Sequence, residues 1–163
     1  MDELFAPPAY EWKRLSPNFR SLRRLTTLIF VPLLFVLPAI LVWVLADLWW
    51  LALILLVIGG VIAGIRLGLI DRTYHSWGYV ERDDDLYITH GVLFRSLVAV
   101  PYGRMQLVEV ESGPLERAFG LATVTLKTAS SETNASIPGL APEEATRLRD
   151  RLTELGEAHA SGL

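Results

Sequence analysis

The chain has 163 residues, of which 52% are hydrophobic, and its formal net charge is −3. Its mean hydropathy of +0.36 exceeds that of ordinary soluble domains, so part of the chain is predicted to lie in lipid. The absence of cysteine excludes disulfides, thiolate metal sites and cysteine nucleophiles, and the slight negative charge gives no global attraction to nucleic acid.

Two apolar runs near the start of the chain predict a transmembrane hairpin over residues 25–70. Between residues 25 and 65 the sequence carries one charge, Asp47, and this stretch is too long for a single crossing of about 20 residues. Leu25–Ala46 would form about 33 Å of helix and Leu48–Ile65 about 27 Å, both near the hydrocarbon thickness of about 30 Å. Asp47 is therefore expected at the turn between two spans.

Basic residues near the ends of these runs predict the orientation. Residues 1–24 form a basic N-terminal segment, and Arg66 and Arg72 follow the second run. Because Lys and Arg accumulate on the cytoplasmic side of spans, both termini are expected to be cytoplasmic. The first run is longer than the apolar part of a signal peptide and a second run follows directly, so cleavage is not expected.

Two kinds of residue are candidates for membrane contacts. Indoles cluster around Asp47, as they do at a headgroup interface, and arginines before the first run are within reach of anionic headgroups, although topology alone also explains them. The predicted interface residues are Arg14, Arg20, Arg23, Arg24, Trp43, Trp49 and Trp50.

Gly60, Gly64 and Gly68 form a small-residue stripe on the second run, with the four-residue spacing that favours close helix packing. The neighbour is either the first helix or a second protein chain. Because no ionisable group lies inside either run, a proton or ion path through these two helices is poorly supported.

From Trp77 onward the hydrophobic period becomes strand-like, which predicts a cytoplasmic domain over residues 73–156. Strands are expected at Trp77–Arg82, Leu86–His90 and Val92–Val100. The first two flank an acidic turn of three aspartates, and glycine at the start of the third marks a bend.

The stretch VEVESGPLERAFGLATVTLKTA, Val108 to Ala129, predicts two further strands around a connector. Apolar and polar residues alternate on both sides, so each strand has one core face. Leu115–Phe119 is expected to be a helical turn closed by Gly120 at positive φ. The connector is expected to pack Leu115, Phe119 and Leu121 under the sheet.

A short strand near Ala135–Ile137 and a helix over Pro142–Leu155 complete the domain. The helix has glutamates in its first turn and Gly156 as its expected stop. Its apolar stripe is Ala145, Leu148, Leu152 and Leu155. Residues 157–163 are predicted to be a flexible tail.

These landmarks resemble the bacterial pleckstrin-homology-like (PH) family, in its membrane-anchored YdbS/YdbT-like branch. The resemblance covers most of the chain, through the basic segment, the hairpin, ITHG, VPYGRMQ, GPLERAFGL and PGLAPEEATRLRDRL. It implies an α+β fold: a two-helix transmembrane hairpin followed by a small PH-like β-sandwich or barrel with a C-terminal helix. It also implies a bacterial inner-membrane location and a non-catalytic interaction or scaffold role.

Candidate chemistry is sparse, so no catalytic, cofactor-binding or metal-ligating residue is predicted. The aspartates Asp83–Asp85 lack the spacing of a calcium loop. The three histidines lack metal-site spacing, and no serine lies in a nucleophile elbow. Eukaryotic PH domains often hold inositol phosphates with cations in the first hairpin loop, where these aspartates would repel a phosphate. Phosphoinositide binding is therefore not expected here.

The sequence thus favours a membrane-anchored, non-enzymatic accessory or assembly subunit of a bacterial membrane protein complex. Its expected partners are the lipid bilayer and another membrane protein or further copies of itself, without nucleic acid or cofactors. A lipid-binding or lipid-modifying enzyme of the membrane surface, and a subunit of a small transporter or channel, remain the alternatives.

Overall fold

The protein is described here by a computed structural model, which covers residues 11–128 and 134–160. The chain forms two compact units. One is the helical unit Arg20–Arg72, and the other, called the domain below, contains the chain before and after it. Residues 1–10 of the predicted N-terminal segment and 161–163 of the predicted tail lie outside the described residues.

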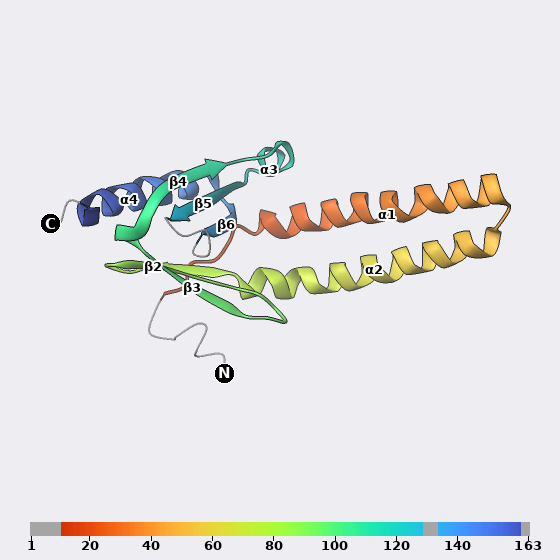
Figure 1. Cartoon of the computed structure of the whole chain (residues 1–163), viewed down its shortest axis with the longest axis horizontal. Helices are drawn as coiled ribbons and strands as arrows, with labels where there is room; N and C mark the ends of the chain where they lie inside the picture. The colour runs from red at the N-terminus through yellow and green to blue at the C-terminus, as the bar shows by residue number, and fades with distance from the viewer. Residues whose placement is uncertain (1–10, 129–133, 161–163) are drawn as a thin grey trace. The chain divides into compact units, whose positions relative to one another are not determined.

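The helical unit confirms the predicted hairpin. Helix α1 (Asn18–Ala46) and helix α2 (Trp49–Ser76) run side by side in opposite directions (Figure 1). Both are long and apolar enough to cross a membrane, and most of their large apolar side chains are exposed. Asp47 forms the turn at a φ of 51°, and its N–H donates to the carbonyl of Trp43 at 3.1 Å.

The two helices approach each other at Gly59. A Cβ atom added at Gly59 would lie 2.7 Å from Cβ of Phe35 on α1, so only glycine fits there. Cβ atoms added at Gly60, Gly64 and Gly68 would meet no atom within 4 Å. Because successive helix positions are about 100° apart, the stripe that begins at Gly60 does not face α1. The first helix is therefore not the neighbour of this stripe, and packing against a second chain stays a prediction.

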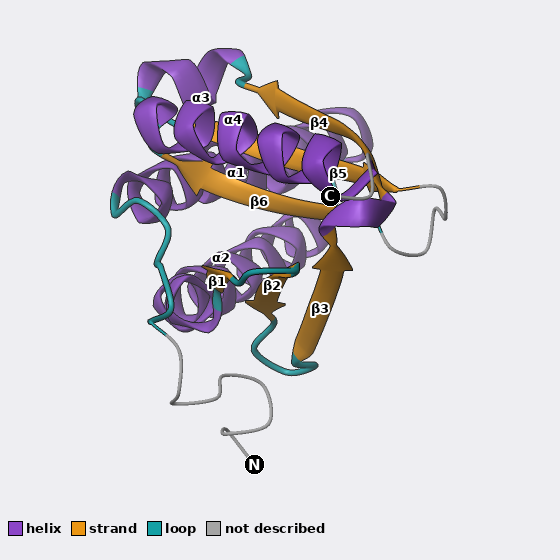
Figure 2. Ribbon diagram, turned by 90° about the vertical axis from the view of Figure 1, so that its left-hand side faces the viewer, coloured by secondary structure: helices purple, strands orange, loops and turns teal. Residues whose placement is uncertain are grey.

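The described residues of the domain form two antiparallel sheets of three strands each, in the orders β1-β2-β3 and β4-β5-β6 (Figure 2). The first comprises β1 (Gly78–Glu81), β2 (Asp85–His90) and β3 (Ser96–Pro101). The second comprises β4 (Met105–Glu111), β5 (Ala122–Thr128) and β6 (Ala135–Leu140). The 3-10 turn η2 (Tyr102–Arg104) joins the sheets, and helix α3 (Pro114–Ala118) joins β4 to β5.

Helix α4 (Pro142–Ala160) packs on the second sheet and on η2. Three members of its predicted apolar stripe, Ala145, Leu148 and Leu152, are fully buried, and the fourth, Leu155, is half-buried. The helix continues through Gly156 to Ala160, whereas the sequence predicted its end at Leu155. Glycine costs only about 1 kcal/mol inside a helix, so it does not by itself end one.

The N-terminal segment is part of this domain. Lys13 pairs with Tyr79 on β1 through two backbone hydrogen bonds of 2.9 and 3.1 Å, and the N–H of Ser16 donates to the carbonyl of Gly139 at 2.9 Å. The segment therefore contacts an end strand of each sheet. The sequence predicted residues 1–24 as a segment separate from the domain. The backbone hydrogen bonds of Lys13 and Ser16 instead join the first part of this segment to the sheets of the domain.

The connector between β4 and β5 differs in part from its prediction. Gly120 has the expected positive φ, 61°, and Leu121 is fully buried, but Leu115 is exposed. The carboxylate of Glu116 fixes the turn, accepting from the N–H of Gly113 and from the hydroxyl of Thr123, each at 2.9 Å. These two hydrogen bonds hold the side of α3 that carries Glu116 against the start of β5. Leu115 is on another side of this short helix and is exposed.

Candidate interaction groove between β4 and α4

Strand β4 is an end strand of its sheet, and among the described residues it pairs only with β5. A β-bulge shifts its register between Met105 and Leu107. Bulges increase local twist and re-aim side chains, and beyond this one Leu107 lies opposite the exposed Lys127. Leu107 is 46% exposed and Val110 is 36% exposed. An end strand also presents a row of backbone N–H and C=O groups outside its sheet.

Two hollows lie between β4 and α4, one near each end of the strand, and together we call them the β4–α4 groove. It has one part of about 420 Å³ and a second of about 280 Å³. The first part is lined by Met105, Gln106, Leu107, Val108, Leu152, Thr153, Gly156 and Glu157. The second is lined by Val110, Ser112, Arg117, Gly120, Leu121, Ala122, Pro142 and Thr146. Because the start of β4 lines the same part as the end of α4, the two elements run in opposite directions along one seam.

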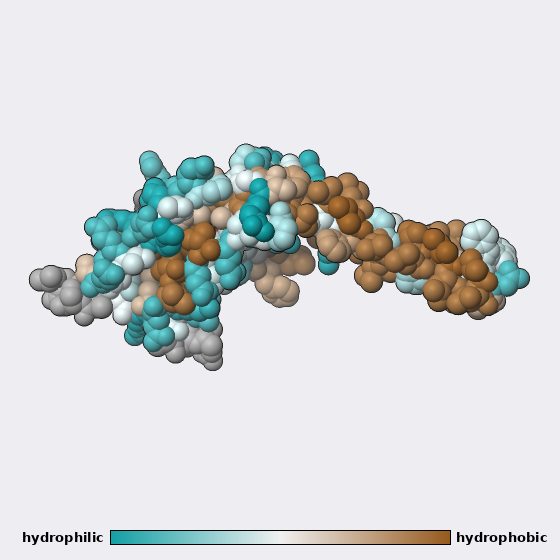
Figure 3. Space-filling view, turned by 90° about the horizontal axis from the view of Figure 1, so that it is seen from above, coloured by the Kyte–Doolittle hydropathy of each residue, from teal (hydrophilic) through white to brown (hydrophobic). Residues whose placement is uncertain are grey.

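The lining of the groove is largely uncharged, with a carboxylate at Glu157 in one part and a guanidinium at Arg117 in the other. Figure 3 views the molecule from the side on which β4 lies in Figure 1, and an apolar patch there interrupts the mostly polar surface of the domain. Apolar side chains beside open backbone groups suit an extended peptide, which adds main-chain hydrogen bonds and places alternate side chains in pockets.

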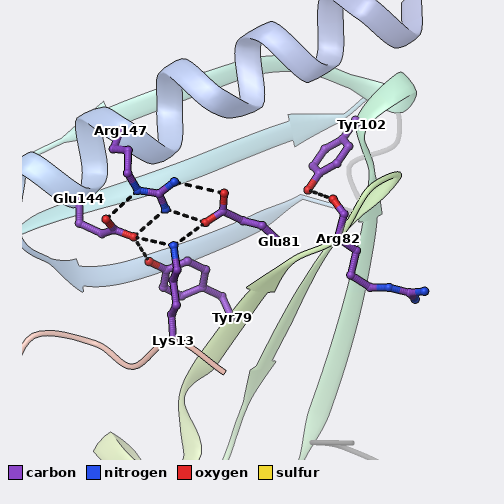
Figure 4. A network of polar contacts seen from close by, with 7 residues as sticks. All are labelled: Lys13, Tyr79, Glu81, Arg82, Tyr102, Glu144 and Arg147. Carbon is purple, nitrogen blue, oxygen red and sulfur yellow. Dashed lines mark hydrogen bonds and ion pairs between the residues drawn. The ribbon is translucent and has the colours of Figure 1, made fainter. Parts of the chain in front are cut away.

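A cluster of charged side chains fixes α4 against β1 and the N-terminal segment (Figure 4). Arg147 donates to Glu81 at 2.6 Å and to Glu144 at 2.7 and 2.8 Å. Lys13 donates to the same two carboxylates at 3.0 and 3.4 Å, and the hydroxyl of Tyr79 donates to Glu144 at 2.6 Å. Two cations thus balance two carboxylates, and the cluster holds one wall of the groove in place.

The pKa values of this cluster follow from its geometry. Hydrogen bonds from Arg147, opposed by burial and aided by Tyr79, lower the pKa of Glu144 to about 2 from its ordinary 4.5. For Glu81, burial raises the pKa, but hydrogen bonds from Arg147 and Lys13 outweigh it and the net pKa is lowered. Burial, together with the bond to Glu144, raises the pKa of Tyr79. Each group is thereby kept in the charge state that its neighbours require, as in a structural ion network.

This arrangement predicts a loss of domain stability in acid. A group whose pKa is depressed by folding contributes stability above its unfolded pKa and loses it as the pH falls through its folded pKa. For Glu144 that window runs from about 4.5 down to about 2. Because about a third of its side chain is exposed, the loss is discounted for solvent screening to roughly 1–2 kcal/mol.

Hydrogen exchange of α4 amides in the full chain, measured between pH 5 and pH 2.5 after correction for intrinsic rates, would detect this loss as faster opening. Glu144→Gln should remove the share of the dependence that comes from this carboxylate, while Glu81 keeps its own. Glu143→Gln, in the same helix turn and exposed, should leave it unchanged. An equal effect of the two substitutions would contradict the role given to Glu144.

Comparison with known proteins then places the chain. A family model described as Bacterial PH domain matches residues 20–156, which is most of the chain. The chain belongs to the bacterial PH domain family. It is also 37% identical over 92 residues to the transmembrane protein YdbS of Bacillus subtilis (strain 168), a match that covers 56% of this chain and 57% of that protein. The chain therefore spans little more than half of the length of this relative. No solved structure matches the chain.

The family match confirms the resemblance to bacterial PH proteins, and the helices and sheets described above confirm the α+β architecture. A membrane location is supported by the transmembrane relative and by the two apolar helices. The name of this relative states no activity, so family membership leaves the function open. Function is therefore inferred from the geometry of the β4–α4 groove.

The predicted membrane-interface residues of this PH domain protein fall into separate places. Arg20 and Arg24 lie beside Asp71 on α2, at 3.8 and 3.2 Å. Arg14 is in the domain, where it donates to the backbone carbonyl of His75 at 2.5 Å. Arg23 is exposed on α1. Trp43, Trp49 and Trp50 are exposed around the turn between the helices. Their contact with headgroups stays a prediction.

Sequence reasoning did not find the groove. The alternation in VEVE indicated a strand, and period-two patterning cannot tell an end strand from a central one. The charged cluster was also missed, since Lys13, Glu81 and Arg147 are far apart in the sequence and no spacing rule connects them. The sequence did predict that the apolar stripe of the last helix packs on the sheet, and this was a hint that α4 lies close to β4.

Proposed function

We propose that this PH domain protein is a non-catalytic, membrane-anchored interaction module that serves as an accessory or assembly subunit of a bacterial membrane protein complex. The observation that carries the proposal is the β4–α4 groove, with the exposed Leu107 on an open strand beside it. The occupant we propose is an extended segment of another membrane protein, which pairs with β4 and places side chains in the groove.

Several features support a partner protein over a reaction. Ligand pockets of enzymes usually enclose most of a substrate and carry convergent polar groups, whereas this groove is open and each of its two parts has a single charged side chain in its lining. The charged cluster is internally satisfied, and its carboxylates are engaged with Arg147 and Lys13. Among the described residues no group of His, Cys, Asp or Glu has metal-site geometry. These observations favour binding, and the absence of catalysis remains part of the proposal.

The proposal includes a topology. Both termini are placed in the cytoplasm and the hairpin in the inner membrane, on the strength of the basic residues that flank the two spans. The domain then meets the cytoplasmic segments of membrane proteins that share the same bilayer. Anchoring to one bilayer raises the effective concentration of such a partner, so that a modest groove is sufficient for assembly.

A photo-crosslinking residue in place of Leu107 tests the proposal in native membranes. We expect a discrete adduct with one membrane protein, and we expect Leu107→Lys to weaken recovery of that protein in mild detergent by at least about tenfold, the effect of one interface hot spot. A lysine on an open strand opposes edge pairing, and because Leu107 is already half-exposed the substitution is not expected to unfold the domain.

The matched control is Ser136, an exposed residue on β6 at the opposite edge of the same sheet. A crosslinker at this position should give no adduct with that protein, and Ser136→Lys should leave its recovery unchanged. Equal losses for the two lysine variants would overturn the assignment to β4. A purified monomer that turns over a phospholipid would favour the enzyme alternative, and ion flux through reconstituted bilayers would favour the channel alternative.

A further inference from the structure

The loop between β2 and β3 exposes two large apolar side chains. Leu93 is 84% exposed and Phe94 is 91% exposed. The loop has a defined turn, because Gly91 has a φ of 104° and any Cβ there would collide with the backbone carbonyl of Phe94. Arg95 follows directly and is exposed. Apolar residues held at a protruding tip beside a cation are costly in water and suit an interface.

A pocket of about 120 Å³ lies at the base of this loop, since Gly91 and Arg95 are among its lining residues. Its full lining is Trp12, Arg14, His75, Ser76, Trp77, Gly78, Thr89, Gly91 and Arg95. The lining includes two guanidiniums and two indoles and no carboxylate. Because ligand pockets for whole molecules start near about 300 Å³, a small anionic group fits this one better than a peptide does.

The first sheet has opposite character at its two ends. Strand β2 begins beside Asp83 and Asp84 in the β1–β2 turn and leads at its other end to Leu93 and Phe94. Its six residues separate the two ends by about 20 Å. An anionic surface repels the first end and attracts the second, so the charge distribution itself favours one orientation of the sheet.

We propose that the β2–β3 tip and the pocket at its base dock on the surface of an anionic phospholipid bilayer. Leu93 and Phe94 enter the boundary between headgroups and acyl chains, Trp12 and Trp77 lie at headgroup level, and Arg14 and Arg95 contact phosphodiester groups. This contact is distinct from the β4–α4 groove, and it concerns the domain itself rather than the spans. A bilayer is favoured over a protein because the chain is already anchored in one.

The absence of native cysteine allows a direct test on the full chain. Leu93→Cys carries an environment-sensitive fluorophore, and the protein is reconstituted into vesicles of phosphatidylcholine with or without phosphatidylglycerol, each containing spin-labelled lipid. We expect blue-shifted emission and strong quenching at position 93 in the vesicles that contain phosphatidylglycerol. In the same vesicles, Arg95→Glu should lower the ratio of inserted to free loop by at least roughly fivefold, the effect of losing one cation at an anionic surface.

The matched control is Asp83→Cys, an exposed position at the acidic end of the same sheet, where the fluorophore should stay in water and unquenched. Equal quenching at positions 83 and 93, or none at 93 in either lipid, overturns the proposal. If the quenching at position 93 is the same with and without phosphatidylglycerol, and is also unchanged by Arg95→Glu, the pocket does not bind anionic headgroups and this part of the proposal is wrong. A label at 93 that stays in water in vesicles but is shielded in native membranes identifies a protein partner and also overturns it. Since the vesicles contain only this chain and lipid, none of these outcomes depends on the groove.

Discussion

Gly139→Ala is expected to destabilise the domain by roughly 2–5 kcal/mol. Gly139 on β6 has a φ of 70°, a conformation that costs other residues about 1–2 kcal/mol. A Cβ there would also collide with the ring of Phe19, which is buried, and overpacking a core adds about 1–3 kcal/mol. Chemical unfolding of the full chain in mild detergent, followed by hydrogen exchange of β6 amides, measures the loss.

Gly120→Ala separates the two causes. Gly120 has a similar φ of 61°, but no atom lies within 4 Å of an added Cβ, so this variant should show the backbone cost alone. In a Phe19→Ala background the additional cost of Gly139→Ala should fall, because the obstructing ring is gone and contacting residues are not additive. If Gly139→Ala costs no more than Gly120→Ala, the close packing of Phe19 on β6 is not what requires glycine.

The elements that the sequence predicted correctly are those with a local signal, such as a repeating pattern of apolar side chains or a glycine at the end of a helical turn. Long apolar runs with Asp47 between them indicated the hairpin, and the spacing of Ala145, Leu148 and Leu152 indicated the buried face of α4. Gly120 was expected at positive φ because a helical turn ends there. In each case the signal is local, so the sequence around the element contains it.

The contacts of the N-terminal segment were missed for the opposite reason. Lys13 joins β1, and Ser16 joins β6, through backbone atoms, and backbone hydrogen bonds impose no pattern on the side chains that precede a membrane span. The basic residues of this segment were interpreted only as a signal of membrane topology. Their contacts with the domain were therefore not predicted. Lys13 is at once a residue of the basic segment and a member of the charged cluster on α4.

The candidate sites depend on tertiary facts of the same kind. Val110 was predicted to face the core, and it does lie opposite the buried Val124, yet it stays partly exposed because β4 is the last strand of its sheet. The glycine stripe on α2 met the spacing rule for helix packing, while the glycine that packs closely on α1 is Gly59. Which edge stays open, and which face meets a neighbour, are decided by the arrangement of elements.

Leu148→Ala on α4 is expected to destabilise the domain by about 2–5 kcal/mol. The side chain is fully buried between α4 and the rest of the domain, so its removal costs the transfer free energy of the lost methyl groups and leaves a cavity. The adjacent Arg149 is exposed and forms its ion pair with its own neighbour Asp150. Arg149→Ala should therefore change the free energy of unfolding by less than about 0.5 kcal/mol.

The two variants also separate stability from binding. Because α4 forms one wall of the β4–α4 groove, Leu148→Ala should reduce crosslinking from position 107 only in proportion to the unfolded fraction, and cooling or added osmolyte should restore it. Leu107→Lys should lose the partner while the free energy of unfolding stays close to that of the original chain. A Leu148→Ala protein as stable as Arg149→Ala would mean that α4 is not packed on the domain as described, and the groove would then lose that wall.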